Sequence, residues 1–79
     1  MIDYESLSPT HNGSYVWPIY YGGPLDGDRH HSVASADIKG SIRMRGGSYS
    51  LQGFRRGKAP AGLEQFAMEF AVYEWVYDK

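Results

Sequence analysis

The chain has 79 residues, a formal net charge of −1 at pH 7, an aromatic content of 15% and no cysteine. This length accommodates one small domain over residues 1–79, and the absence of cysteine excludes disulfides and thiolate metal sites as stabilisers. No apolar run approaches the roughly 20 residues that cross a bilayer, and the N-terminus lacks the features of a secretory signal, so we expect a cytoplasmic protein. Aromatic packing must then supply the core, within a monomer or across a homodimer.

The N-terminal part of the chain holds one clear strand. Residues 1–12 contain turn signals and are expected to form a loosely ordered lead-in. From Tyr15 to Tyr21 the residues alternate as in a strand, and Pro18 favours a sheet edge or a bulge for it. The segment from His30 to Ile38 is a weaker strand candidate.

A glycine-rich loop, Gly22-Gly23-Pro24-Leu25-Asp26-Gly27, follows that strand. We interpret it as a turn in which glycine supplies positive φ and Asp26 caps backbone amides. The alternative, an anion-binding loop, lacks the Gly-Lys-Ser/Thr ending and the spacing of a dinucleotide fingerprint. Metal binding by Asp26, Asp28, His30 and His31 is disfavoured, because adjacent histidines on a strand point to opposite faces. We therefore expect neither a metal nor a cofactor.

The middle of the chain predicts a β-hairpin. Ser41–Arg45 and Ser48–Gln52 alternate between apolar and polar residues around Gly46-Gly47, a pair that suits a two-residue turn. The predicted register separates an apolar face from a polar one by pairing Arg45 with Ser48, Met44 with Tyr49, Arg43 with Ser50 and Ile42 with Leu51. A bulge at Gly53 would return Phe54 to the apolar side and leave two arginines near the polar, outer face, Arg55 and Arg56.

The C-terminal segment has two interpretations. A helix would place one set of residues on a single face, namely Leu63, Phe66, Phe70, Tyr73 and Tyr77. A strand is indicated by the alternation of Tyr73, Trp75 and Tyr77 and by the valines among them, whereas residues 63–68 would accept a helix. We predict a mainly β fold, a small antiparallel sheet around the Gly-Gly hairpin, with a C-terminal helix and an α+β fold as the alternative. The two aromatic-rich ends of the chain are expected to meet.

Charge is distributed unevenly along the chain. Residues 38–63 contain no acidic residue but hold six of the eight basic ones, Lys39, Arg43, Arg45, Arg55, Arg56 and Lys58. We predict that this segment contacts a partner, with Arg43 and Arg45 as anchors, Arg55 and Arg56 as a second patch, and Gly22, Gly23, Asp26 and Gly27 as a rim. Tyr49 or Phe54 would add stacking if exposed. The alternative is that the arginines keep a sheet edge soluble or pair with the acidic ends of the chain.

The residue types favour a binding protein over an enzyme, because there is no cysteine nucleophile and no serine in a nucleophile-elbow pattern. A protein partner tolerates the mixed charge of the chain. Nucleic acid is the second choice, because the sequence pI of about 6.2 lies far below the range of dedicated nucleic-acid binders. A phosphorylated nucleotide held in a dimer cleft is a third option, which a ligand-induced rise in melting temperature would reveal.

Two motifs carry a family resemblance. The strand end Tyr20-Tyr21 with the loop Gly22–Gly27, together with the aromatic-rich Val72–Val76, resembles very small uncharacterised proteins of bacteriophages and their actinobacterial hosts. The resemblance implies a phage-type accessory protein, which would act in the host cytoplasm by binding and blocking a host protein or a defence complex. We therefore expect a non-enzymatic, anti-CRISPR-like inhibitor.

Overall fold

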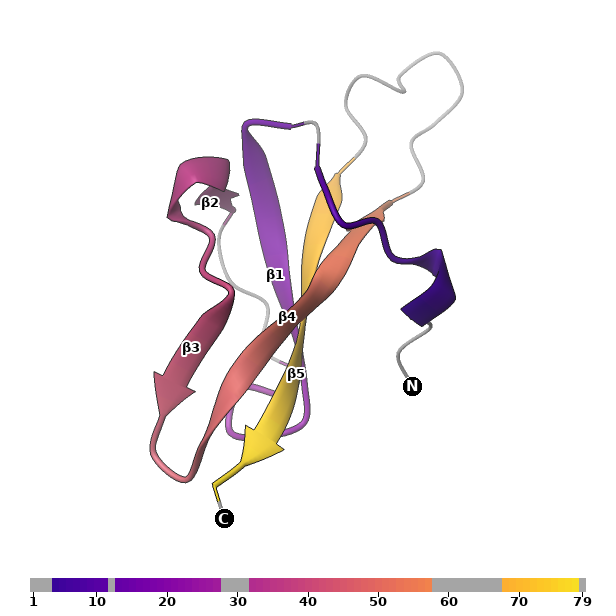
Figure 1. The fold of residues 1–79 in the computed structure, drawn as a ribbon. Coiled ribbons are helices and arrows are strands. Elements are labelled where there is room, and N and C mark those ends of the chain that lie inside the picture. The colour runs from indigo at the N-terminus through magenta and orange to yellow at the C-terminus, as the bar shows by residue number, and fades with distance from the viewer. Residues whose placement is uncertain (1–3, 12, 28–31, 58–67, 79) are drawn as a thin grey trace.

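A computed structural model describes residues 4–11, 13–27, 32–57 and 68–78 of the chain (Figure 1). Its elements are η1 (Tyr4–Ser6), β1 (Tyr15–Tyr21), β2 (Val33–Ala34), η2 (Ser35–Asp37), β3 (Ser41–Met44), β4 (Gly47–Arg56) and β5 (Glu69–Tyr77). The strands form one curled sheet in the order β2-β1-β5-β4-β3. The prediction of a mainly β fold is confirmed, but the sheet is mixed rather than antiparallel throughout, because β1 and β5 pair in parallel.

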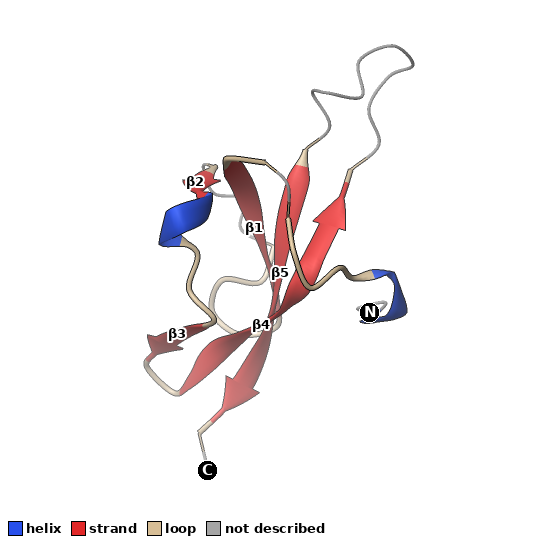
Figure 2. Ribbon diagram, turned by 45° about the horizontal axis from the view of Figure 1, so that its top comes forward, coloured by secondary structure: helices blue, strands red, loops and turns tan. Residues whose placement is uncertain are grey.

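The two aromatic-rich ends of the chain lie side by side in the sheet, as predicted. β1 and β5 pair in parallel, with Trp17 opposite Phe70 and Tyr20 opposite Tyr73. β5 also pairs with β4 in antiparallel fashion, so it occupies the centre of the sheet (Figure 2). A parallel pair requires a long connection, and here β2, β3 and β4 all lie between the two partners in the sequence.

The C-terminal segment is a strand where the structure describes it. β5 covers Glu69–Tyr77, which confirms the strand interpretation for the aromatic and valine residues. The helix considered for residues 63–68 falls outside the described residues, apart from Met68.

The hairpin between β3 and β4 forms, but its predicted register is wrong. Ile42 lies opposite Tyr49 and Met44 opposite Gly47, so Arg45-Gly46 makes the turn in place of Gly46-Gly47. Only Gly46 of the two turn residues has positive φ, at 91°, as in a type II turn. The shift moves each partner by two residues and therefore leaves every side chain on its predicted face.

Trp75 explains why Gly47 belongs to β4 and not to the turn. A Cβ atom at Gly47 would lie 2.6 Å from Cζ2 of Trp75 and would also meet the carbonyl oxygen of Val76. Gly47 is buried, and no larger residue fits at this place beside β5.

The predicted bulge in β4 is confirmed. The register with β5 shifts between Leu51 and Gly53, and Gly53 has a φ of 152°. The extra residue restores Phe54 to the core, where it is 7% exposed. Arg55 and Arg56 follow as exposed residues at the end of the strand.

The N-terminal segment contacts the sheet over the part that the structure describes. Ser8 exchanges two backbone hydrogen bonds of 2.8 Å with Phe54. The hydroxyl of Tyr4 donates to the carboxylate of Glu74, a bond that raises the pKa of Tyr4. Leu7 lies over Gly53, because a Cβ atom added at Gly53 would be 2.9 Å from the Cβ atom of Leu7.

The weaker strand candidate is short. β2 contains only Val33 and Ala34, which pair with Val16 and Tyr15, and η2 follows directly. The rest of β1, including Pro18, has no second partner strand among the described residues. Among the described residues, Pro18 therefore lies at an unpaired edge of the sheet. This position suits proline because it has no backbone N–H to donate.

Side chains alternate across the strands and give the sheet two faces. The core face buries one cluster, Val16, Tyr20, Tyr49, Phe54, Ala71 and Tyr73. The ring of Tyr20 lies 4.8 Å from that of Tyr49 and 5.6 Å from that of Tyr73, measured between centroids. Val72 points to the opposite side, which we call the outer face, and is nevertheless only 1% exposed. The outer face therefore has an apolar layer of its own.

Candidate binding groove

The outer face of β1 and β5 carries aromatic and aliphatic side chains in register. Trp17 pairs with Phe70 and Phe70 with Arg55, so these three side chains form one row across β1, β5 and β4. Two residues further along, Ile19 pairs with Val72. Because side chains on one face recur every second residue, these rows lie on the same face of the sheet.

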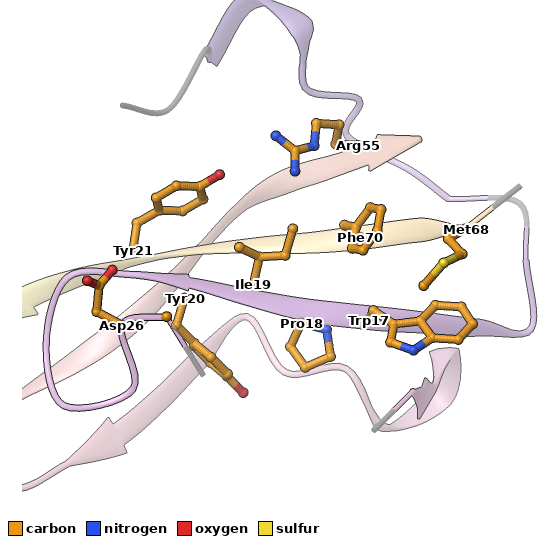
Figure 3. Close-up of a pocket in the computed structure, with 10 residues that line it drawn as sticks. Trp17, Pro18, Ile19, Tyr20, Tyr21, Asp26, Arg55, Met68 and Phe70 are labelled. Atoms are coloured by element: carbon orange, nitrogen blue, oxygen red, sulfur yellow. The ribbon is translucent and has the colours of Figure 1, made fainter. Parts of the chain in front are cut away.

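A groove runs over these rows (Figure 3). It encloses about 610 Å³, within the range of ordinary ligand-binding clefts. Its lining residues are Trp17, Pro18, Ile19, Tyr20, Tyr21, Asp26, Gly27, Arg55, Met68 and Phe70. Ile19, Tyr21, Phe70 and Arg55 line it from the outer face. Pro18 and Tyr20 point to the other side of β1, as Figure 3 shows, so the groove also reaches around the edge of that strand.

Arg55 supplies the positive charge of the groove. Its Cζ atom lies 5.7 Å from the centroid of the Phe70 ring, an arrangement that a cation–π attraction favours. Arg55 is exposed and makes no ion pair with any other residue that the structure describes. The guanidinium is thus held beside the Phe70 ring, and it carries five N–H donors and no acceptor.

Asp26 supplies a negative charge, and the turn holds it in place. Its Oδ1 atom accepts a 2.9 Å hydrogen bond from the backbone N–H of Gly22. The φ angles of Gly22, Gly23 and Gly27 lie between 70° and 81°. These observations confirm the turn interpretation, with glycine in the left-handed region and Asp26 as an amide cap.

The same turn is tied to the core through Tyr49. The hydroxyl of Tyr49 donates to the carbonyl oxygen of Gly22 and accepts from the N–H of Leu25, both at 2.7 Å. The N–H of Asp26 donates to the carbonyl oxygen of Gly23 at 3.3 Å. Because the amides of Gly22, Leu25 and Asp26 already have partners inside the protein, these three N–H groups are not free for an anion.

The predicted anchors lie far from the groove. Arg43 pairs with Asp78 at 3.2 Å between Nη2 and Oδ2, and Arg45 is exposed in the hairpin turn. Arg43 faces Ser48, seven positions along β4 from Arg55, which corresponds to roughly 20 Å. The basic residues of this segment that the structure describes therefore do not form one continuous patch.

The remaining predicted contact residues are dispersed. Arg56 is exposed but points to the core-face side of the sheet, opposite Glu69. Lys39 is exposed, and its carbonyl oxygen accepts a 2.7 Å hydrogen bond from Tyr73. Lys58 lies outside the described residues, as do Asp28, His30 and His31.

Two predicted contact residues belong to the core instead. Tyr49 is fully buried and Phe54 is 7% exposed, so neither ring can stack on a partner in this fold. Tyr49 pairs with Ile42 and with Trp75 on neighbouring strands, and Phe54 packs against the ring of His11. Both rings are therefore structural.

Sequence reasoning missed most of the groove, above all Trp17, Ile19, Met68 and Phe70. The available signal was that both alternating sets of β1 are apolar, since Val16, Pro18 and Tyr20 face the core while Trp17, Ile19 and Tyr21 face outward. A strand that is apolar on both sides leaves apolar surface exposed unless other residues pack against each side.

Within the described ranges, no three histidine, aspartate or glutamate side chains are grouped closely enough to hold a metal ion. The same parts of the chain contain no helix with the length and hydropathy needed to span a membrane. Comparison with protein-family models, with curated proteins and with solved structures finds no match to this chain.

Proposed function

We propose that the protein is a non-enzymatic binding domain that contacts a protein partner through its outer face. The observation that carries this proposal is the groove, in which half-exposed aromatic side chains lie beside the guanidinium of Arg55, which forms no ion pair with another residue that the structure describes. Tryptophan, tyrosine, methionine and arginine are the residue types enriched in protein–protein interfaces, where buried anchors carry most of the binding energy.

The charge pattern of the outer face favours protein over nucleic acid. Asp26 lines the groove, and Glu74 lies on the same face between Tyr21 and Ser50. A phosphate backbone that reached from Arg55 toward Arg43 would pass Glu74 beside Ser50, and this carboxylate repels it. A protein surface can supply both signs of charge and so suits the mixed face better.

The family resemblance supports an inhibitory role for this contact. On this proposal the protein acts in the cytoplasm of a bacterial host, where it blocks a host protein or defence complex by covering part of its surface. The groove anchors the contact, the turn with Asp26 and Gly27 forms its rim, and Arg43 and Arg45 form a separate basic patch about 20 Å away that steers the approach.

The test is affinity capture from an actinobacterial lysate, with and without nuclease. Arg55→Glu is the informative variant, and Arg56→Glu is its matched control, because the same charge change occurs one residue away on the opposite side of the sheet. We expect one host protein to survive nuclease treatment, to be lost with Arg55→Glu and to be kept with Arg56→Glu.

Other results would contradict the proposal. Recovery of nucleic acid alone, lost on nuclease treatment or in moderate salt, would assign the protein to nucleic-acid binding. Equal loss with both variants would remove the groove from the contact. An empty eluate combined with a melting temperature that rises with nucleoside phosphates would identify a small-ligand function.

A further inference from the structure

The segment Tyr4–Ser8, which we call the strap, lies against the sheet close to the groove (Figure 1). Its middle residue, Leu7, lies over Gly53 of β4. The hydroxyl at its start, on Tyr4, donates to the carboxylate of Glu74 on β5. The strap therefore contacts the two strands that stand next to β1 on the outer face.

The strap and the groove share the same rows of the sheet. Val72 of β5 lies between Gly53 of β4, which is under the strap, and Ile19 of β1, which lines the groove. Glu74, to which the strap is bonded, lies beside Tyr21, another residue of the groove lining. The apolar floor of the groove therefore continues from β1 to the surface under the strap.

Leu7 fills a notch that the sheet leaves at Gly53. A Cβ atom at Gly53 would lie 2.9 Å from the Cβ of Leu7 and 3.0 Å from the carbonyl oxygen of Ser8, so a side chain here on β4 would exclude the strap. Leu7 is half-buried, whereas the other four strap residues are exposed. Val72, beside the notch, is only 1% exposed. A branched apolar side chain is thus what this notch accommodates.

The strap is held to the sheet near its two ends. Ser8 exchanges two backbone hydrogen bonds with Phe54 at one end, and Tyr4 donates to Glu74 at the other. The bond between Tyr4 and Glu74 is exposed, so water can replace either partner when it breaks. A segment with mostly exposed residues and little buried apolar surface opens at a lower free energy than the sheet beneath it. The strap can therefore detach while the strands stay paired.

We propose that the strap is autoinhibitory: it closes part of the outer face, and the protein partner displaces it and places an apolar side chain of its own in the notch over Gly53. Displacement joins the notch, Val72 and Ile19 into one apolar strip across β4, β5 and β1. Buried anchors of this kind carry much of the energy of protein interfaces. This inference rests on the proposed protein-binding function and adds the chemistry of an anchor and its regulation.

Hydrogen exchange measures the opening of the strap directly. The N–H of Phe54 donates to Ser8 in the strap, whereas the N–H of Leu51 on the same strand donates to Gly40. Tyr4→Phe removes the bond to Glu74 and should speed exchange of the Phe54 amide about threefold or more, with the Leu51 amide unchanged. No acceleration, or equal acceleration at both amides, would overturn the inference.

A fluorescent dye measures the apolar surface that the opening uncovers. Anilinonaphthalene sulfonate fluoresces on such surface. Exchange and dye binding both depend on the fraction of open molecules, so Tyr4→Phe should raise the apparent dye affinity by the same factor as the exchange rate. Tyr15→Phe is the matched control, because Tyr15 is 59% and Tyr4 52% exposed, and it should change neither quantity. An unchanged dye affinity in Tyr4→Phe would contradict a covered strip.

A crosslink tests the competition between the strap and the partner. The chain has no cysteine, so Tyr4→Cys combined with Glu74→Cys gives a single pair of thiols that a short bismaleimide joins, which fixes the strap closed. We expect affinity capture with this double variant to retain the host protein before crosslinking and to lose most of it afterwards. Arg55 is unchanged in both forms, so equal capture would show that the strap does not compete.

The two proposals fail separately. If a host protein is lost with Arg55→Glu but is captured equally well with and without the crosslink, only the autoinhibitory strap is wrong. If the capture yields nucleic acid alone, the protein-binding function is wrong, whereas faster exchange at Phe54 together with a higher dye affinity would still establish a strap that covers apolar surface.

Discussion

The indole ring of Trp75 occupies the space in which a side chain at Gly23 would begin. A Cβ atom at Gly23 would lie 2.6 Å from Cγ of Trp75, a separation that real Cβ atoms essentially never show. The same ring excludes a side chain at Gly47 on β4. Glycines from the loop after β1 and from the hairpin thus leave room for one aromatic residue of β5, which joins three distant parts of the sequence.

Gly23→Ala should destabilise the protein more than Gly27→Ala. Both glycines have positive φ, at 70° and 81°, so alanine introduces similar backbone strain at each, of roughly 1–2 kcal/mol. Nothing lies within 4 Å of a Cβ at Gly27, whereas the one at Gly23 meets Trp75. The overpacking adds about 1–3 kcal/mol at Gly23 only. Urea unfolding of both variants measures the difference, and equal losses would contradict the contact with Trp75.

Tyr49→Phe should cost about 1–3 kcal/mol of unfolding free energy. The substitution keeps the buried ring but leaves the N–H of Leu25 and the carbonyl oxygen of Gly22 without their 2.7 Å partner. Tyr15→Phe is the control, because Tyr15 is 59% exposed and should change stability by less than about 0.5 kcal/mol. Chemical denaturation followed by circular dichroism measures both variants. A neutral Tyr49→Phe would show that the turn does not depend on this hydroxyl.

Reversing Arg43 and Arg45 to glutamate should leave the melting temperature almost unchanged. The ion pair of Arg43 with Asp78 is largely exposed, with 76% and 45% of the two side chains accessible, and such pairs contribute little to stability. Under the proposed function, the reversal should slow association with the partner, whereas Arg55→Glu should speed dissociation. Surface plasmon resonance separates the two rates. If the reversal of Arg43 and Arg45 speeds dissociation and Arg55→Glu slows association, the anchor lies at the hairpin.

Stability should fall as the pH rises above 10. Burial raises the pKa of the Tyr20 and Tyr73 hydroxyls above the usual 10.0, so the folded protein holds these protons more tightly than the unfolded chain. Their contribution is complete below pH 10 and is lost as the pH rises through the raised pKa values.

Urea midpoints measured from about pH 9 to about pH 12 test this dependence. Tyr20→Phe removes one of the two hydroxyls and should make the alkaline decline shallower. Tyr77→Phe, at a position 75% exposed, serves as the control and should keep the parental slope. A decline equally steep in all three proteins would locate the alkaline sensitivity elsewhere.

Local patterns in the sequence predicted the strands and turns whose formation depends on residues close together in the chain. The alternation from Tyr15 to Tyr21, the hairpin around Gly46, and the bulge at Gly53 all follow from side-chain period and glycine placement, and each is found in the structure. The turn role of Gly22–Gly27 likewise follows from residues within six positions of each other.

Tertiary contacts decided between arrangements that the local sequence pattern allows equally. Gly46 and Gly47 serve a turn equally well, and contacts with Trp75 and Val76, about thirty residues away, assign one to the turn and the other to the strand. The parallel pairing of β1 with β5 joins segments more than fifty residues apart, and no local signal specifies such a contact.

The groove depends on that pairing. The sequence by itself determined a small β domain with aromatic ends, a glycine turn and scattered basic residues. The tertiary structure alone decided that Arg55, Phe70 and Trp17 stand in one row and that Tyr49 and Phe54 are buried. The physical reason is that an apolar strand can turn either set of side chains to the core, and the choice is made by the strands that pack beside it.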